Sequence, residues 1–213
     1  MFRSFLLLVL SLSLQFISTS SESQKCHLLK VRKEIDVEKL SKTSWYTGLQ
    51  TADVVASMLS CTRFSNFTYT NSGFRVVVTE HGSRYVQFGL HFNRDENGIY
   101  HLSKSDRGIN HAEHISEMDE HDNEAVLDMD QLLAGGNFVF VTDYENYFAS
   151  FLCPPGGISD HEHRMIRGFF PSPNSILSQV AAFINVLHGV GISAKFYPST
   201  CSETNWSQEL PIE

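Results

Sequence analysis

The stretch from Asn137 to Cys153, NFVFVTDYENYFASFLC, constrains the fold of this chain more than any other segment. Two runs rich in aromatic and β-branched residues, 138–142 and 147–153, flank the polar break at residues 143–146. This pattern predicts a β-hairpin. Because an isolated hairpin is only marginally stable in water, further strands are needed to cover its apolar faces.

Alternating sequences elsewhere in the chain supply those strands. We expect them at residues 45–51, 62–70, 74–79, 84–92, 125–132 and 163–170. With the hairpin this makes eight antiparallel strands, enough to close an up-and-down β-barrel around one small ligand. A C-terminal helix is predicted to begin at Ser172-Pro173 and to end at Gly189 or Gly191, with an apolar stripe packed on the outside of the barrel. The predicted fold class is all-β with one C-terminal helix.

The alternation also predicts which side chains face the inside of the barrel. In the strand at 84–92 the even positions from 86 to 92 are apolar, whereas Gln87 and His91 alternate with them and should face water. The sequon Asn66-Phe67-Thr68 should place a glycan outside on Asn66, which turns the neighbours at 67 and 69 inward. A second sequon begins at Asn205. The residues predicted to line a ligand cavity are Phe67, Tyr69, Phe74, Val76, Val86, Phe88, Leu90 and Phe140.

The N-terminus indicates where the protein acts. Arg3 precedes an apolar run that is too short and too rich in serine to span a bilayer. Residues 1–20 are therefore predicted to be a secretory signal peptide, and 21–213 a single extracellular domain. The polar C-terminal SQELPIE gives no sign of a lipid-anchor signal, so we expect no membrane anchor. The formal net charge of −8 argues against nucleic-acid binding.

Four cysteines, Cys26, Cys61, Cys153 and Cys201, follow the predicted leader. An even number in a secreted chain predicts two disulfides, and the sequence alone allows three pairings. With every thiol used in this way, no cysteine nucleophile remains. A binding protein without enzymatic activity is favoured over a metal-assisted enzyme that uses the histidines.

Several motifs resemble those of the lipocalin family. The string TDYENY at 142–147 is similar to the second lipocalin signature, most closely in the insect-type branch of apolipoprotein D and the bilin-binding proteins. Asp36 and Trp45-Tyr46 resemble the first signature, although Thr43 stands where the family usually has glycine. Arg167 resembles the arginine of the third signature, which packs over that tryptophan, and Arg164 is an equal candidate by position. The resemblance implies two disulfides, Cys26 with Cys153 and Cys61 with Cys201.

The segment 93–123 is longer and more polar than the usual connection in this family, and it is predicted to be an insertion. His111, His114 and His121 alternate with acidic residues there and could in principle bind zinc or copper. The favoured interpretation is a solvated acidic loop, because neither a metal-finger spacing nor HExxH is present. His161 and His163 are interpreted in the same way, so no metal site is predicted.

Together these patterns predict a secreted carrier that binds a small hydrophobic ligand inside a β-barrel. No cofactor is expected other than a bound pigment or lipid, whose identity the sequence does not define. The alternative is a protein-binding or inhibitory lipocalin that acts through its surface loops. The choice between them rests on family analogy and on the inward apolar faces.

Overall fold

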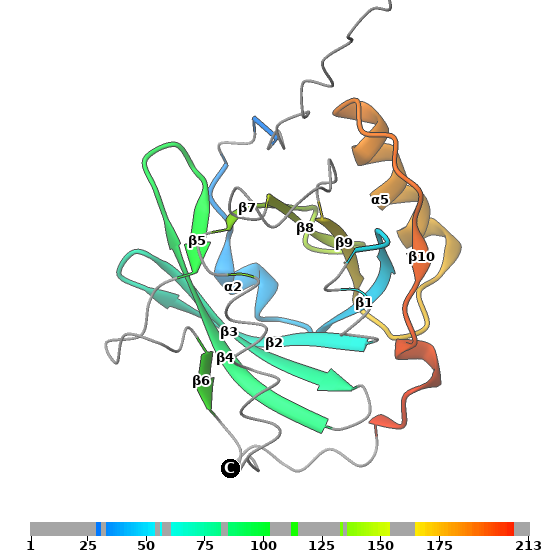
Figure 1. Cartoon of the computed structure of the whole chain (residues 1–213), viewed down its shortest axis with the longest axis horizontal. Helices are drawn as coiled ribbons and strands as arrows, with labels where there is room; N and C mark the ends of the chain where they lie inside the picture. Colours follow the sequence, from blue (N-terminus) through cyan, green and yellow to red (C-terminus); the bar gives the residue numbers. More distant parts are fainter. Residues whose placement is uncertain are drawn as a thin grey trace, which may run out of the picture.

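The computed structural model describes residues 29–30, 33–53, 56, 61–81, 85–102, 112–114, 133, 136–153 and 165–206, with the backbone alone at 85–86 and 112–114. Eight strands, each antiparallel to the next, form a barrel that closes where β9 pairs with β1 (Figure 1). They are β1 (Trp45–Gln50), β2 (Cys61–Thr70), β3 (Gly73–His81), β4 (Tyr85–Arg94), β5 (Tyr100–Leu102), β7 (Asn137–Thr142), β8 (Phe148–Cys153) and β9 (Met165–Phe170). The predicted eight-stranded barrel is confirmed.

The central hairpin is also confirmed. β7 and β8 pair in continuous register from Asn137 opposite Cys153 to Thr142 opposite Phe148. In the turn between them, Asp143 Oδ1 accepts hydrogen bonds from the backbone N–H of residues 145, 146 and 147, at 3.0, 2.7 and 3.1 Å. The polar break therefore has a structural role, since one carboxylate satisfies three backbone donors that the turn leaves without strand partners.

One end of the barrel is closed by the short helix α2 (Val37–Leu40) and the tryptophan that follows it. Asp36 caps this helix by accepting a hydrogen bond from the Lys39 backbone N–H at 3.1 Å. Trp45 is fully buried, its Nε1 donates to the Leu40 carbonyl at 3.1 Å, and its ring lies 6.1 Å from that of Phe148. Trp45 thus plugs the closed end of the barrel.

Two apolar layers hold the molecule together. One fills the barrel, and the other lies between its outer wall and helix α5 (Leu177–Gly189), which runs outside the barrel in Figure 1. Phe183 and Leu187 are the buried residues of α5, and the Phe183 ring contacts that of Phe170 edge to face at 6.1 Å. A side chain at Gly168 would place Cβ 2.9 Å from the Phe183 ring, so glycine lets the helix approach the wall.

The helix begins later than predicted. Its N-cap is Ile176, whereas the Ser172 hydroxyl accepts a hydrogen bond from the Asn174 backbone N–H at 3.2 Å within the preceding turn. Ile176 and Leu177 are 59% and 84% exposed, so the packed part of the predicted apolar stripe starts further along the helix. Within the described residues, no helix combines the length and the apolar character that crossing a bilayer requires.

The fifth strand of the barrel lies where an insertion was expected. Residues 125–132 are outside the described part of the chain, and β5 occupies the place between β4 and β7. β4 extends to Arg94, and Asp95 Oδ1 then accepts hydrogen bonds from the N–H of Asn97 and Ile99, both at 2.9 Å. Tyr100 is buried beside the barrel core, so the prediction that the insertion begins at residue 93 is wrong.

A second short strand, β6 (Ala112–His114), pairs with the same strand β4. Phe92 lies opposite Leu102 in β5, but Leu90 lies opposite Ala112 in β6. If β5 continued in its own register, Leu90 would lie opposite residue 104. It lies opposite residue 112 instead, so the registers of β5 and β6 differ by eight residues. β5 and β6 thus pair with neighbouring parts of β4 in two different registers.

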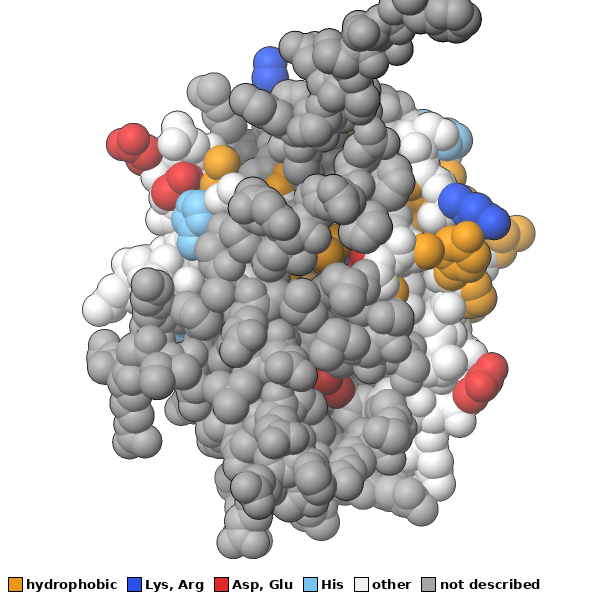
Figure 2. Space-filling view, in the orientation of Figure 1, with side chains coloured by type: hydrophobic (Ala, Val, Ile, Leu, Met, Phe, Trp, Pro, Cys, Tyr) orange, Lys and Arg blue, Asp and Glu red, His pale blue; other side chains and the backbone are white. Residues whose placement is uncertain are grey.

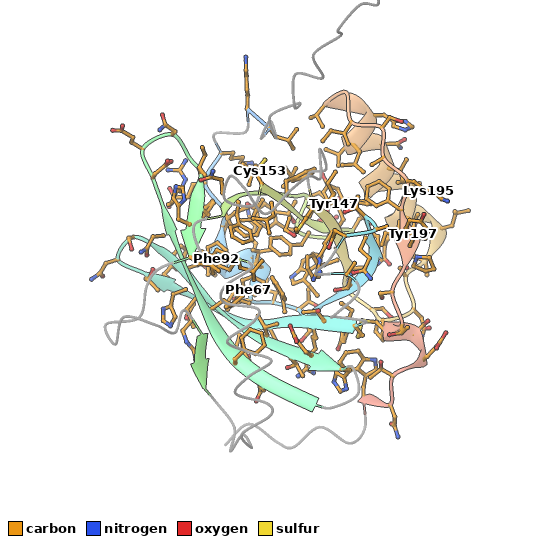
Figure 3. All side chains as sticks on the ribbon, in the orientation of Figure 1. Phe67, Phe92, Tyr147, Cys153, Lys195 and Tyr197 are labelled. Atoms are coloured by element: carbon orange, nitrogen blue, oxygen red, sulfur yellow. A yellow bond between two sulfur atoms is a disulfide. The ribbon has the colours of Figure 1, made fainter. Side chains whose placement is uncertain are left out.

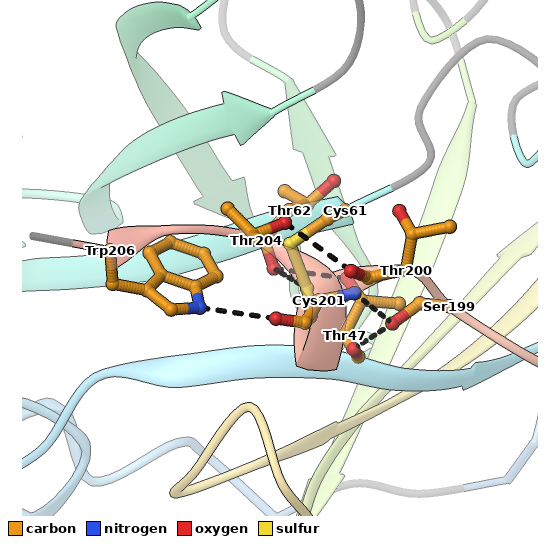
Figure 4. The surroundings of a disulfide bond; sticks show 8 residues. All are labelled: Thr47, Cys61, Thr62, Ser199, Thr200, Cys201, Thr204 and Trp206. Carbon is orange, nitrogen blue, oxygen red and sulfur yellow. Dashed lines mark hydrogen bonds between the residues drawn. A yellow bond between two sulfur atoms is a disulfide. The ribbon is translucent and has the colours of Figure 1, made fainter. Parts of the chain in front are cut away.

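The C-terminal segment is attached to the barrel beside β1. Strand β10 (Tyr197–Pro198) pairs with β1, and the 3₁₀ turn η1 (Cys201–Glu203) follows it. A disulfide joins Cys61 to Cys201 with a Cα–Cα distance of 4.8 Å, as predicted (Figure 4). It spans 140 residues, and on the chain-entropy model the closure of so long a loop contributes about 3 to 5 kcal/mol. Cys153 is also disulfide-bonded, and its predicted partner Cys26 lies outside the described residues.

Candidate ligand-binding site

The barrel encloses a cavity with a mainly apolar wall. It leaves about 60 Å³ for the centres of water-sized spheres. A few apolar side chains are visible near the centre of the face shown in Figure 2. The lining residues are Thr62, Phe64, Val78, Glu80, Phe88, Leu90, Phe92, Leu133, Phe138, Phe140, Ser150, Leu152, Met165, Arg167 and Phe169.

Three of the predicted site residues lie in this wall. Phe88 and Leu90 project inward from β4, and Phe140 projects inward from β7. Each is no more than 4% exposed. The inward parity predicted for β4 is therefore correct for its described side chains, and the side chain of Val86 lies outside them.

Three others are buried in the barrel but do not line the cavity. Phe67, Phe74 and Val76 are at most 3% exposed and belong to the apolar core. The Phe74 ring lies 5.1 Å from that of Phe92 and 5.4 Å from that of Phe140, so aromatic packing fills this part of the barrel. Figure 3 shows Phe67 and Phe92 within the ring of strands.

Tyr69 does not line the cavity, and its prediction as a site residue is wrong. Its side chain is 61% exposed. It lies opposite Phe74 in the β2–β3 pair, so its parity is inward, but it stands one residue from the end of β2. This position is near the closed end of the barrel, beside the turn between β2 and β3.

A β-bulge in β2 explains the alternation around the first sequon. The register with β3 shifts between Ser65 and Thr68, and Asn66 adopts a positive φ of 49°. Phe64 and Phe67 can therefore both be buried although they are three residues apart. Asn66 is exposed at the bulge and Asn205 is exposed in the C-terminal segment; glycosylation of both stays a prediction.

Gln87 points to the outside of the barrel as predicted, but it is not exposed to solvent as predicted. Gln87 alternates with the cavity residues of β4 and is only 6% exposed. Its Nε2 donates a hydrogen bond to Thr79 Oγ1 at 3.3 Å, on the same outer face. Gln87 is thus a buried polar residue with a hydrogen-bonding partner and does not face water as predicted.

The polar part of the cavity wall was not predicted from the sequence. Thr62 lies opposite Glu80 in the β2–β3 pair, and Ser150 lies opposite Arg167 in the β8–β9 pair. Arg167 also lies opposite Gln50, the last residue of β1. Since Trp45 is the first residue of that strand, Arg167 is at the other end of β1 and does not pack over the tryptophan as the third signature implied.

Three atoms of this polar wall are buried and have no hydrogen-bonding partner: Thr62 Oγ1, Glu80 Oε1 and Arg167 Nη2. Burial raises the pKa of the Glu80 carboxyl to about 8, and the positive charge of Arg167 only partly opposes this shift. Burial also lowers the pKa of Arg167, while the acidic groups of Asp53 and Glu80 act to raise it. At pH 7 the guanidinium is still protonated and Glu80 is mostly uncharged.

The histidines considered as metal ligands do not form a site in the described part of the chain. His111, His121, His161 and His163 lie outside it, and of His114 only the backbone is described. Among the described residues, no group of three or more histidine, cysteine or acidic side chains could hold a metal ion.

Comparisons with known proteins identify structural likeness without sequence likeness. No family model matches the chain, and no curated protein matches its sequence. The major allergen Per a 4 from cockroaches superposes with a TM-score of 0.54 at 11% identity, over 85% of this chain and 99% of the allergen. Lobster apocrustacyanin A1 (TM-score 0.46, 14% identity, 81% of this chain and 89% of that chain) and the siderocalin Ex-FABP (0.43, 10%, 73% and 89%) score lower.

A closed antiparallel barrel of eight strands around an apolar cavity places the chain among the up-and-down β-barrel proteins. The helix after the last barrel strand and the plugged end define it further. The protein has the lipocalin fold.

Proposed function

We propose that this protein binds a small, mainly apolar ligand inside its barrel and serves as a secreted carrier. The observation that supports this most is the cavity itself, in which eleven of the fifteen lining residues are apolar. A pocket of this kind favours an apolar ligand body, and a few polar groups fix its orientation. Because α2 and Trp45 plug one end, the ligand would enter from the opposite end of the strands.

The size of the cavity limits the ligand. The rings of Phe92, Phe138 and Phe140 lie with their centres 5.1 to 6.1 Å apart and occupy much of the barrel. A space of about 60 Å³ for water-sized centres suits a short aliphatic or single-ring molecule. A large pigment would require several of these buried rings to move, at a cost in packing.

Secretion is supported by the disulfide between Cys61 and Cys201, because such bonds persist mainly in oxidising compartments. The predicted signal peptide at 1–20 agrees with this but lies outside the described residues. The same disulfide and the TDYENY turn support placing the protein near the apolipoprotein D and bilin-binding branch. A binding role without catalysis is part of the proposal.

Native mass spectrometry of the secreted protein tests this function. We expect a small organic molecule to be retained, to be released by solvent extraction, and to be replaced by 1-octanol with a Kd below about 1 mM. If the secreted protein carries no adduct and octanol does not bind, the barrel is not a carrier of small apolar ligands.

A further inference from the structure

We propose that Arg167, Glu80 and Thr62 form an anion subsite in the cavity wall, and that the ligand is a small amphiphile with a carboxylate headgroup and an apolar tail. This inference rests on the proposed function, because it specifies which ligand the barrel holds. It assigns a binding role to three polar side chains that the apolar interior does not otherwise explain.

The strand register brings these side chains to one part of the cavity. Thr62 is the second residue of β2 and lies opposite Glu80, which is the residue before the last in β3. Arg167 lies in β9, opposite the last residue of β1, and β1 separates β9 from β2 in the barrel. All three residues line the same cavity and lie toward the end opposite the plug at Trp45.

The polar atoms of this subsite are not satisfied by the protein. Arg167 Nη2, Glu80 Oε1 and Thr62 Oγ1 are buried and lack hydrogen-bonding partners. An unsatisfied buried polar group costs about 1 to 3 kcal/mol, and more when it is charged. In the described structure no ion pair joins Glu80 to Arg167 directly, so these two residues do not satisfy one another.

The charge balance favours an anionic ligand over a cationic one. Arg167 stays protonated, and its other acidic neighbour, Asp53, already accepts hydrogen bonds from Thr51 Oγ1 at 2.9 Å and from the Ala56 backbone N–H at 2.8 Å. Burial raises the pKa of Glu80 to about 8, so at neutral pH it is mainly a neutral carboxylic acid that can donate a hydrogen bond. Among the described residues that line the cavity, Arg167 is therefore the one that carries a charge at neutral pH, and Asp53, which acts on that charge, lies outside the lining.

A ligand carboxylate would complement this arrangement. It could accept a charge-assisted hydrogen bond from the guanidinium and further hydrogen bonds from the Glu80 carboxyl and the Thr62 hydroxyl. The tail would then lie among apolar residues of the same cavity, such as Phe88, Leu90 and Phe140. The polar part of the cavity wall would thus bind the headgroup, and the apolar part of the same wall would contact the tail.

The test compares three probes of equal chain length, octanoate, 1-octanol and octylamine, by isothermal titration calorimetry at pH 6.5. For the unmodified protein we expect octanoate to bind at least tenfold more tightly than octanol, a difference of about 1.4 kcal/mol, and octylamine to bind least tightly. In Arg167→Met the octanoate affinity should fall to that of octanol, while octanol binding changes less than threefold. Arg167→Lys should keep part of the preference. Arg75→Met, on the outer face of β3, is the matched control and should leave all three affinities unchanged.

The outcomes separate this inference from the proposed function. Equal binding of octanoate and octanol by the unmodified protein would overturn the anion subsite and leave the apolar carrier standing. Tightest binding of octylamine would also overturn it, because Glu80 would then act as a carboxylate. If none of the three probes binds, the proposed function fails, and the subsite fails with it. Because the first comparison needs no variant, it stands even if Arg167→Met does not fold.

Discussion

The backbone N–H of Asp36 donates a hydrogen bond to the hydroxyl of Tyr144 at 3.0 Å, and so connects the cap of α2 to the turn of the central hairpin. The two residues are 108 positions apart in the chain. Lys39 lies over the same ring, with its Nζ 5.3 Å from the ring centre. Two motifs that resemble separate lipocalin signatures thus meet at the closed end of the barrel, where their role is structural.

This contact predicts that Tyr144→Phe destabilises the protein by about 1 kcal/mol, the usual net contribution of one hydrogen bond. The ring stays in place, so the change removes only the acceptor for the Asp36 N–H. Urea unfolding measures the effect. Tyr69→Phe is the control, since its side chain is 61% exposed, and it should unfold at the wild-type urea concentration. Equal effects of the two substitutions would show that the bond at Tyr144 does not stabilise the fold.

Asp143 should stabilise the hairpin in a way that depends on pH. Burial raises the pKa of its carboxyl, but hydrogen bonds from Asn146 and from the backbone N–H groups of Glu145 and Tyr147 outweigh this and leave the pKa below its usual value. The stabilisation is therefore complete above the unfolded pKa of about 3.9 and is lost as the pH falls through the lower folded pKa.

We accordingly expect Asp143→Asn to lower the free energy of unfolding by about 1 to 2 kcal/mol at pH 7. The difference from the wild type should shrink below pH 4, because the carboxyl is protonated first in the unfolded state and then, at lower pH, in the native state. Thermal unfolding from pH 3 to 7 measures this. Glu145→Gln, at an exposed position in the same turn, should show no comparable difference at any pH. A destabilisation that is equally large at pH 3 would contradict the electrostatic explanation.

The parts of the fold that the sequence predicted are those in which local pattern and tertiary packing agree. The hairpin has aromatic and β-branched runs on both sides of a turn, and β4 alternates without interruption, so the inward position of Phe88 followed from parity alone. The pairing of Cys61 with Cys201 followed only from the family resemblance. It could not be derived from the cysteine count.

The parts that were missed depend on relations between strands. β5 has only three residues, too few for alternation to stand out in a polar segment. The buried side chain of Gln87 is hydrogen-bonded to Thr79 on the neighbouring strand, and the sequence of β4 alone does not indicate this contact. The polar wall brings Glu80 and Arg167 together from strands far apart in the sequence, and only the barrel register shows that they line one cavity. Charged residues near strand ends are ordinarily interpreted as exposed.

Glu80 should make the stability of the protein depend on pH in the opposite sense to Asp143. Its pKa is raised from 4.5 to about 8 by burial, so between these values the native state binds more protons than the unfolded state. The free energy of unfolding contributed by this group therefore falls as the pH rises from about 4.5 to about 8. Glu80→Gln should flatten that slope and be more stable than the wild type at pH 8 relative to pH 5. The control is Glu96→Gln, at an exposed turn position, and it should keep the wild-type slope. An unchanged slope in Glu80→Gln would mean that Glu80 is ionised at neutral pH.

The position of Phe88 in the cavity wall predicts a loss of ligand affinity when a charge is placed there. Phe88 is 3% exposed and lines the cavity, whereas Tyr69 was also predicted as a site residue but is 61% exposed. Phe88→Asp should weaken the binding of 1-octanol at least tenfold, because a buried carboxylate disfavours an apolar ligand beside it. Tyr69→Asp introduces the same charge in place of a similar ring and should change the affinity less than threefold.

Calorimetric titration of both variants, with far-ultraviolet circular dichroism to confirm the β-barrel, completes this test. Phe88→Asp is also expected to unfold at a lower temperature than the wild type, since the charge loses hydration in the apolar wall. For this reason the titration is made well below the unfolding temperature of the variant. If Tyr69→Asp abolishes binding while Phe88→Asp retains it, the ligand lies at the end of the barrel near the β2–β3 turn, and the cavity lined by Phe88 is part of the packed core.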